Sequence, residues 1–357
     1  MKILQLIFAL SSGGAERFVV DLSNRLAQNK DDEVVLVTIM DDLNPLWTYY
    51  KRDLSSNVRF INLHCHRGLS LKSIVRIFKV IKREKADIVH AHCNLIMLYL
   101  PAFLLRSCGY VHTLHNLAEY CLPWRCLRGV NRWLYKNRVQ AITISHECDK
   151  SFKKLYALDT SICIINGREP IKIDGSSKIK LKRNYPVFIH VARCATQKNQ
   201  TRLFKTFERL SSDGFEYELL CLGRDYGEYM ERYKNHPQIH VLGEKMNVGD
   251  YMENADYFIL SSDYEGLPLT LLEAMSIGLT PISTPAGGVV DVIRDGENGY
   301  ITSSFDDDEF YYKVKDIIVN RRKISPDSIR REFDLLYSME LCTKKYHTVY
   351  QRIHSAE

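Results

Sequence analysis

The sequence predicts an α/β protein with two doubly wound domains, each a parallel sheet covered by helices on both faces. Its 357 residues suffice for two domains that each have their own core. Short apolar runs alternate with amphipathic helical patterns along most of the chain, which is typical of parallel sheets. One polar stretch interrupts this alternation and separates two halves. Two such domains place a cleft between them, where ligands of these folds bind.

The first domain is expected at residues 1–166. Short apolar runs predict its strands, and apolar residues three and four positions apart predict its helices. We expect strands at 3–8, 34–39, 58–63, 88–91, 111–114 and 141–144, and helices at about 15–28, 71–85 and 95–105.

The polar stretch at 167–184 contains Pro170, Gly175 and two serines, and we expect it to be the linker between the domains. The second domain is expected at 185–335, followed by a C-terminal segment at 336–357. We expect strands at 187–191, 218–222, 239–242, 257–260 and 280–283, and helices at about 197–210, 248–254 and 268–277 and from there to the chain end.

Positive charge is concentrated in one region of the chain. The formal net charge is +6, but residues 67–138 alone hold 13 Lys and Arg against 3 Asp and Glu. The helix expected at 71–85 is basic and amphipathic, and Trp124 and Trp133 lie among arginines. Such a surface suits an anionic membrane, although a solvated helix face is the alternative. We expect a cytoplasmic protein on the inner face of the cell membrane, and no nucleic-acid binding because no binding motif accompanies the charge.

Cysteine spacing and hydropathy exclude several classes of protein. The ten cysteines include no C-x-x-C pair and no cluster with histidines, so we expect reduced thiols and neither a metal site nor a cofactor. The longest strongly apolar run, at 95–105, is too short to cross a bilayer. The apolar start of the chain resembles a minimal signal peptide, but it is equally a first buried strand that continues into an amphipathic helix.

Two glutamates, Glu265 and Glu273, bracket seven residues where a strand turns into a helix. Gly266 allows a sharp turn, and Pro268 suits the first position of the helix. The first N–H groups of a helix have no intrahelical acceptor and carry partial positive charge, so they can hold a diphosphate. About two turns in, Glu273 can accept hydrogen bonds from two neighbouring hydroxyls, and together these groups indicate a nucleotide sugar. The amides expected to hold the anion are those of Gly266, Leu267, Leu269 and Thr270.

Two further loops follow strands and carry groups that suit an anionic ligand. Gly13 and Gly14 let the backbone approach a ligand at the start of the first helix, although a tight turn without a ligand is the alternative. Their spacing does not fit the G-x-G-x-x-G fingerprint of dinucleotide-binding proteins. Arg193 and Lys198 follow the first strand of the second domain, where they can neutralise a leaving diphosphate or, alternatively, are solvated.

His112, His115 and Asn116 lie at the carboxyl end of a predicted strand in the first domain. In doubly wound folds this end of the sheet faces the ligand. A single histidine is more often structural, so a ligand contact and a structural role both stay open for His115.

Taken in order, these motifs resemble the retaining glycosyltransferases of family 4, which have the GT-B fold, and the resemblance runs nearly end to end. Each motif alone is weak, whereas the ordered set is specific, most of all between residues 256 and 299. The motifs are Gly13-Gly14, the DIVHAH of 87–92, His115, Asn166-Gly167, Arg193 with Lys198, Glu265 with Glu273, Pro285-Ala286-Gly287-Gly288, and Asp295-Gly296-Glu297-Asn298-Gly299.

The resemblance implies transfer of a sugar from a UDP- or GDP-sugar to a glycan or lipid-linked acceptor, in the synthesis of a surface polysaccharide. It implies that His115 lies near the donor sugar and Gly14 near the phosphates. It implies no metal, because cationic side chains and helix ends stabilise the leaving group. The last helix, at about 338–354, is expected to cross back to the first domain.

Four positions of the second domain take roles from the same resemblance. Arg193 and Lys198 would bind the donor diphosphate, and Glu273 would bind the ribose hydroxyls. Glu265 and the amides after it would hold the donor sugar and phosphate. Front-face attack and a short-lived ion pair both remain open as the route to retention, and a covalent intermediate on Glu265 is a further alternative by analogy with retaining hydrolases.

Some positions depart from the family pattern. Ala192 replaces a glycine, Arg168-Glu169 follow the Asn-Gly, and Arg224-Asp225 follow Gly223. The last departure leaves the choice between UDP and GDP open. An epimerase or phosphorylase on the same fold, and a catalytically silent sugar-nucleotide-binding subunit, remain alternatives to the transferase.

Overall fold

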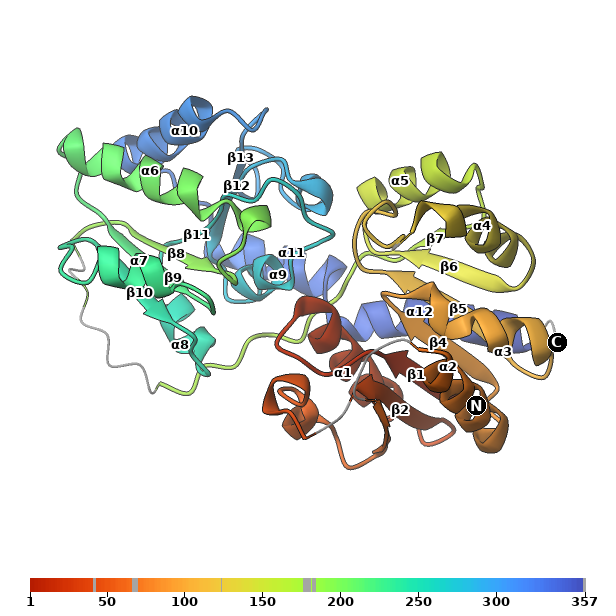
Figure 1. Cartoon of the computed structure of the whole chain (residues 1–357). Helices are drawn as coiled ribbons and strands as arrows, with labels where there is room; N and C mark the ends of the chain where they lie inside the picture. Colours follow the sequence, from red (N-terminus) through yellow and green to blue (C-terminus); the bar gives the residue numbers. More distant parts are fainter. Residues whose placement is uncertain (41–42, 66–69, 123, 176–180, 182–183, 356–357) are drawn as a thin grey trace. The chain divides into compact units, whose positions relative to one another are not determined.

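The chain forms two α/β units in its computed structural model (Figure 1). The first unit comprises Met1–Glu169 together with Tyr337–Glu357, and the second comprises Pro170–Leu336. The structure describes residues 1–40, 43–65, 70–122, 124–175, 181 and 184–355. Residues 176–180 and 182–183 of the predicted linker, and 67–69 of the basic region, lie outside the described residues.

A seven-stranded parallel sheet forms the centre of the first unit. Its strand order is β3-β2-β1-β4-β5-β6-β7, so the chain moves outward from β1 and then continues from β4 on the other side. Every residue of β4 and β5 is buried, because helices cover both faces of a doubly wound sheet. The strands are β1 Lys2–Ile7, β2 Glu33–Met40, β3 Val58–Cys65, β4 Ile88–His92, β5 Gly109–Leu114, β6 Val139–Thr143 and β7 Ile162–Cys163.

The helices of the first unit differ in part from the predicted ones. The helix predicted at 95–105 is a 3-10 turn followed by a short α-helix, because the Asn94 side chain accepts a hydrogen bond from the Ile96 amide and starts the turn. In the described ranges, no helix combines the length and apolar character needed to cross a membrane. The α-helices are α1 Gly14–Leu26, α2 Leu71–Glu84, α3 Tyr99–Leu104, α4 Arg128–Asn137, α5 His146–Tyr156 and α12 Met339–Ser355, and the 3-10 turns are η1 Pro45–Trp47, η2 Lys51–Asp53, η3 Leu95–Leu98 and η4 Arg125–Leu127.

The last helix of the chain, α12, packs within the first unit beside α1. Tyr346 and Tyr350 of α12 are completely buried. Their hydroxyls hydrogen-bond to side chains of the sheet, Tyr346 to Thr113 at 3.1 Å and Tyr350 to His90 at 2.6 Å. The C-terminal segment therefore contributes polar groups to the interior of the first unit.

The second unit has a six-stranded parallel sheet in the order β10-β9-β8-β11-β12-β13. Two parallel sheets of this kind confirm the predicted fold class. Every predicted strand is present with ends shifted by at most two residues, whereas β7 and β13, of two residues each, are too short to show a pattern. The strands are β8 Val187–Val191, β9 Glu218–Leu222, β10 Ile239–Gly243, β11 Tyr257–Leu260, β12 Thr280–Ser283 and β13 Tyr300–Ile301.

The helix predicted at 197–210 begins only at Gln200. Residues Thr196–Lys198 form the 3-10 turn η5, and Asn199, with a φ of 44°, accepts a hydrogen bond from the Arg202 amide and caps the helix. The helices are α6 Gln200–Ser212, α7 Gly227–Arg232, α8 Val248–Glu253, α9 Leu269–Ser276, α10 Asp307–Asn320 and α11 Pro326–Leu336, with the 3-10 turn η6 Gly287–Asp291.

The strand order places a topological switch point in each unit. In the second unit β8 pairs with β9 on one side and with β11 on the other, and in the first unit β1 lies between β2 and β4. Loops after such strands leave the sheet in opposite directions, and ligands of doubly wound folds bind there. The candidate site residues lie in these loops and at the end of β5.

Candidate active site

The loop after β11 buries Glu265 in the second unit, where its side chain meets Lys198. Glu265 is 4% exposed, and its Oε1 accepts hydrogen bonds from Lys198 Nζ at 2.5 Å and from Ser262 Oγ at 2.7 Å. Gln197 Nε2 lies 3.4 Å from Oε2. A buried carboxylate is costly unless it is paired and hydrogen-bonded, so these donors are what allow its burial. Two predicted site residues thus form an ion pair.

The backbone around Glu265 is held by the segment after β12. Gly288 N donates to the Gly266 carbonyl at 2.9 Å, and Thr284 Oγ1 donates to the Ser262 carbonyl at 2.5 Å. Gly287 has a φ of 54°, and a Cβ there would lie 1.8 Å from the Glu265 carbonyl oxygen. Only glycine fits this left-handed position in contact with the loop. The two adjacent glycines of the family motif therefore fix the turn that carries Glu265.

Helix α9 begins one residue later than the sequence predicts. Pro268, with a φ of −69° and a ψ of 121°, is the N-cap residue, and Leu269 is the first helical residue. Among the described residues we find no hydrogen-bond acceptor for the backbone N–H groups at the start of α9. These groups can bind an anion, because the helix dipole adds partial positive charge there. They belong to Gly266, Leu267, Leu269 and Thr270.

Glu273 is the fifth residue of α9, which starts at Leu269. At about 3.6 residues per turn it lies little more than one turn into the helix, so the expectation of two turns was wrong. Its side chain is partly exposed, and its carbonyl oxygen accepts a hydrogen bond from Ser276 Oγ at 2.6 Å. The carboxylate therefore lies on the same short helix as the anion-binding amides.

Arg193 lies exposed in the loop after β8, and the buried side chain of Gln200 hydrogen-bonds to its backbone. Gln200 is 3% exposed, and its Nε2 donates to the Arg193 carbonyl at 3.0 Å. The loop is also fixed against β9, since a Cβ on Gly223 would lie 1.9 Å from the Ala192 carbonyl oxygen. No described carboxylate forms an ion pair with the Arg193 guanidinium. The charge of Arg193 is thus presented on a rigid backbone.

The glycine loop after β1 carries an unexpected carboxylate. Gly13 is the N-cap of α1 and Gly14 its first residue. Glu16 Oε1 accepts a hydrogen bond from Ser11 Oγ at 2.7 Å, and a Cβ on Gly13 would lie 2.3 Å from Glu16 Oε2. The Glu16 carboxylate therefore lies against the loop, next to the amides that were expected to meet phosphates.

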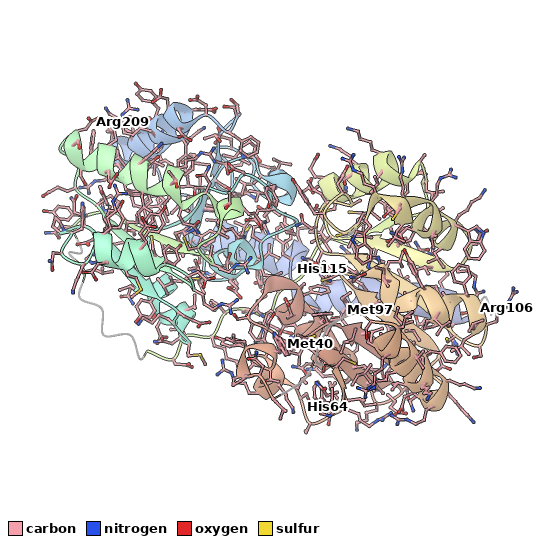
Figure 2. All side chains as sticks on the ribbon, in the orientation of Figure 1. Met40, His64, Met97, Arg106, His115 and Arg209 are labelled. Carbon is pink, nitrogen blue, oxygen red and sulfur yellow. The ribbon has the colours of Figure 1, made fainter. Side chains whose placement is uncertain are left out.

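His115 and His112, near the end of β5, differ in their surroundings. The Nε2 of His115, which is labelled in Figure 2, lies 3.0 Å from His92 Nδ1. Burial lowers the pKa of His115 to about 3, so the ring is neutral at pH 7. His112 is completely enclosed, and its Nδ1 lies 2.8 Å from the Tyr135 hydroxyl. His112 is therefore structural. His92 belongs to the DIVHAH motif, and its spacing of two from His90 along β4 places both side chains on one face of the sheet.

The described residues offer no metal cluster, and a groove among them lies away from the candidate site residues. No three His, Cys, Asp or Glu side chains among them come together as a possible metal site. A groove of about 300 Å³ lies at the far end of α1 from the glycine loop. Two of its lining side chains, Arg25 and His347, already contact Glu169 and Asp32. Its lining residues are Arg25, Leu26, Asn29, Thr343, Lys344, His347 and Thr348.

Known protein families match both halves of the chain. Residues 12–167, in the first unit, match the family described as Glycosyltransferase Family 4. Residues 173–332, in the second unit, match the family described as Glycosyl transferases group 1. Together the two matches cover every strand of the two sheets except β1, and all the candidate site residues.

Two curated relatives extend over most of the chain. UDP-Gal:alpha-D-GlcNAc-diphosphoundecaprenol alpha-1,3-galactosyltransferase of Escherichia coli is 29% identical over 300 residues, which cover 76% of this chain and 77% of the relative. GalNAc-alpha-(1->4)-GalNAc-alpha-(1->3)-diNAcBac-PP-undecaprenol alpha-1,4-N-acetyl-D-galactosaminyltransferase of Campylobacter jejuni is 24% identical over 330 residues, covering 90% and 89%.

Solved structures share the fold at low sequence identity. Sucrose-phosphate synthase from Thermosynechococcus elongatus has a TM-score of 0.81 at 16% identity, with 100% of both chains covered. HepE of Anabaena, in complex with UDP and glucose, has a TM-score of 0.79 at 17% identity, with 99% of this chain and 100% of that chain covered.

Proposed function

Since the chain belongs to the group 1 glycosyltransferases of the family 4 type, with the GT-B fold, we propose that it transfers a sugar from a UDP- or GDP-sugar to a lipid-linked glycan with retention of configuration. The names of both curated relatives support a lipid-linked acceptor, since each specifies an undecaprenol diphosphate. The Anabaena structure in complex with UDP and glucose supports a nucleotide-sugar donor. The proposed product is a bacterial surface polysaccharide.

One observation carries the proposed donor site. The loops after β8 and β11, two neighbouring parallel strands, bring Lys198 to Glu265 beside a helix start whose amides lack an acceptor in the described residues. We assign Arg193, Lys198 and these amides to the donor diphosphate. When the bond between the anomeric carbon and the phosphate oxygen breaks, the electron pair stays with the diphosphate. Cations and amides at that oxygen stabilise the developing charge.

The side chain of Glu265 has a supporting role in this proposal. Oε1 already accepts hydrogen bonds from Lys198 and Ser262, so the carboxylate holds the ammonium at the strand end while a phosphate binds its other N–H groups. Glu273, further along α9, is assigned to the ribose hydroxyls. An ionised carboxylate is a pure acceptor, which matches a pair of hydroxyl donors.

For the glycine loop we propose a role other than the phosphate contact expected from the resemblance. A phosphate at the start of α1 would lie beside the Glu16 carboxylate and be repelled. We therefore assign Gly13 and Gly14 to uncharged hydroxyl groups of the substrate. His115, which is neutral, is assigned to a hydroxyl of the donor sugar.

For the acceptor side we propose that the surface of α3 and α4 docks on an anionic membrane. Phe103 and Trp133 are 48% and 46% exposed, and their rings stack at 5.0 Å with planes 16° apart. Arg106, labelled in Figure 2, and Lys136 are exposed nearby in sequence. Exposed aromatic rings beside cations suit the headgroup region of an anionic bilayer. We call Phe103, Leu104, Arg106, Trp133 and Lys136 the α3–α4 surface.

Some cations of the basic region are occupied elsewhere. Arg138 donates from Nε to the Ala102 carbonyl and from Nη2 to the Leu105 carbonyl, both at 3.0 Å. Arg76 Nη1 donates to the Leu63 carbonyl at 2.7 Å. These guanidinium groups donate hydrogen bonds to backbone carbonyls at the end of α3 and in β3. The membrane proposal therefore depends on the α3–α4 surface and on exposed lysines of α2 such as Lys79 and Lys82.

Liposome flotation tests the membrane proposal. The double variant Phe103→Ser/Trp133→Ser is expected to lose most of its recovery with anionic liposomes. Tyr312→Ser is the matched control, because Tyr312 is a 56% exposed aromatic residue of α10 in the second unit. Equal recovery of the wild type with neutral and anionic liposomes would contradict the proposal.

A donor panel tests the proposed reaction. The protein is incubated with UDP- and GDP-sugars and an undecaprenyl-diphosphate-linked acceptor, while release of nucleoside diphosphate and the anomeric configuration of the product are measured. We expect nucleoside diphosphate to be released only when the acceptor is present. The product should keep the anomeric configuration of the donor. Binding of a donor without release in the presence of acceptor supports the silent subunit, and inversion contradicts the retaining mechanism.

A further inference from the structure

Seven side chains of the first unit form one continuous hydrogen-bonded network that ends at His115. All members except His115 are completely buried. We call this set the His115 network. In order, the separations are Tyr346 Oη to Thr113 Oγ1 3.1 Å, Thr113 Oγ1 to His90 Nε2 2.7 Å, His90 Nδ1 to Tyr350 Oη 2.6 Å, Tyr350 Oη to Gln5 Nε2 3.3 Å, Gln5 Oε1 to His92 Nε2 2.7 Å, and His92 Nδ1 to His115 Nε2 3.0 Å.

No charged group takes part in these hydrogen bonds. Burial lowers the pKa of His90 and His92 well below 6.5, so both rings are neutral at pH 7. A neutral imidazole has one nitrogen that donates and one that accepts. The direction of each hydrogen bond therefore decides the direction of the next, and the whole network runs in one of two directions.

The amide of Gln5 selects the direction. Its Oε1 faces His92, and a carbonyl oxygen only accepts, so His92 Nε2 donates and His92 Nδ1 accepts. It follows that His115 Nε2 carries a proton and donates to His92. The separation of 3.3 Å on the other side of Gln5 is nearer the usual N–H···O range than the shorter O–H···O range, which favours an amide nitrogen facing Tyr350.

We propose that Gln5 and His92 are positioning residues, which hold His115 as the tautomer with an unprotonated Nδ1 that accepts a hydrogen bond from a hydroxyl of the donor sugar. Among the described residues His115 Nδ1 has no hydrogen-bond partner. Phe18 packs edge-on against the His115 ring, with centroids 5.4 Å apart, and hinders its rotation. A neutral accepting nitrogen suits a hydroxyl and not a phosphate oxygen, which has no proton to donate. The sugar rests on the proposed function, whereas the tautomer does not.

Nitrogen NMR of the full chain labelled with ¹⁵N-histidine tests the tautomer without any substrate. His115 is expected to carry its proton on Nε2 in the wild type and to lose this preference in Gln5→Met, which removes the accepting carbonyl at similar side-chain length. Tyr135→Phe is the control, because it removes a buried hydroxyl from His112 and leaves the His115 network intact. A proton on Nδ1 in the wild type, or an unchanged tautomer in Gln5→Met, overturns the proposal.

Ligand affinity separates positioning from a general loss of structure. Gln5→Met is expected to bind the nucleotide sugar about tenfold more weakly, as for one lost hydrogen bond, and to bind the free nucleoside diphosphate as the wild type does. His92→Gln can still donate to Gln5 and accept from His115, whereas His92→Leu can do neither. We therefore expect His92→Gln to retain more affinity for the nucleotide sugar than His92→Leu. Equal losses for both ligands overturn the sugar contact. Absence of transfer by the wild type contradicts the proposed function instead, and leaves the NMR result valid.

Discussion

Lys198 Nζ lies 2.5 Å from Glu265 Oε1 although the two residues are 67 positions apart in the sequence. Lys198 ends the 3-10 turn after β8, and Glu265 lies in the loop after β11. The contact exists because β8 and β11 are parallel neighbours, so their carboxyl ends meet at one edge of the sheet. The Lys198 carbonyl also accepts a hydrogen bond from Ser261 Oγ at 2.9 Å, which fixes the two loops together.

Removing the cation of this pair is expected to lower both stability and activity. Lys198→Ala leaves the Glu265 carboxylate buried without a counter-ion, which costs about 3–5 kcal/mol of unfolding free energy. Urea unfolding of the second unit measures this loss. Glu265→Gln in the Lys198→Ala background should recover part of the stability but not the activity. Lys205→Ala, which removes an exposed lysine of α6, is the control; a similar loss there contradicts the assignment.

Gly287 is expected to tolerate no side chain. In Gly287→Ala the left-handed backbone and a Cβ placed 1.8 Å from the Glu265 carbonyl oxygen both oppose folding. Gly296 is the matched control, because its φ of 78° is also left-handed but a Cβ there meets nothing within 4 Å. Gly296→Ala should cost only the backbone strain of about 1 kcal/mol. Transfer activity and thermal unfolding should fall clearly further in Gly287→Ala, and equal effects would contradict the steric argument.

Most strands could be predicted because they are largely apolar and buried, as β1, β2, β8, β9 and β11 are. Helices α4 and α5 could not, since α4 buries only three of its residues and carries exposed Trp133 and arginines instead of an apolar stripe. Its stability comes from tertiary contacts: Leu134 and Tyr135 belong to the apolar core of the first unit, and Asn131 hydrogen-bonds to Tyr99 of α3 and Tyr156 of α5. Tertiary packing of this kind leaves a weak local pattern.

Individual site residues were predictable, but their partners were not. Glu265 and Lys198 stand out by motif, whereas Ser262 and Gln197 donate to Glu265 only because a turn and a neighbouring loop place them there. Contacts between loops depend on strand order, which short-range sequence patterns do not encode.

The buried histidines are expected to make the first unit less stable in acid. Burial lowers the pKa of His112 and of His115 to about 3, from the usual value of about 6.5 in the unfolded chain. Below pH 6.5 the unfolded chain therefore binds protons that the folded chain does not, and the free energy of unfolding decreases as the pH falls. At pH 5.5 each of these two histidines should lower the free energy of unfolding by about 1.4 kcal/mol.

Hydrogen exchange of β4 and β5 at pH 7.5 and 5.5, corrected for intrinsic rates, measures this effect in the first unit. His112→Gln should reduce the pH dependence by the share of one histidine. Tyr135→Phe removes the same hydrogen bond at His112 but keeps the imidazole, so its stability should be lower at both pH values with the slope unchanged. Equal stability of the wild type at both pH values would show that these rings are protonated in the fold.

Glu273 is expected to contribute affinity for the nucleoside part of the donor. Its carboxylate is partly exposed on α9, the helix whose first amides we assign to the diphosphate. Glu273→Ala removes a charged acceptor of hydroxyl hydrogen bonds, which should weaken binding of the nucleoside diphosphate about tenfold or more. Calorimetry with UDP, GDP and their 2′-deoxy analogues measures this directly. The wild type should prefer the ribose forms, and Glu273→Ala should bind both forms alike.

Glu253→Ala is the control for this prediction. It removes an exposed glutamate of α8 and is expected to change neither affinity. Ribose preference that survives in Glu273→Ala would place the hydroxyl acceptor elsewhere on the second unit.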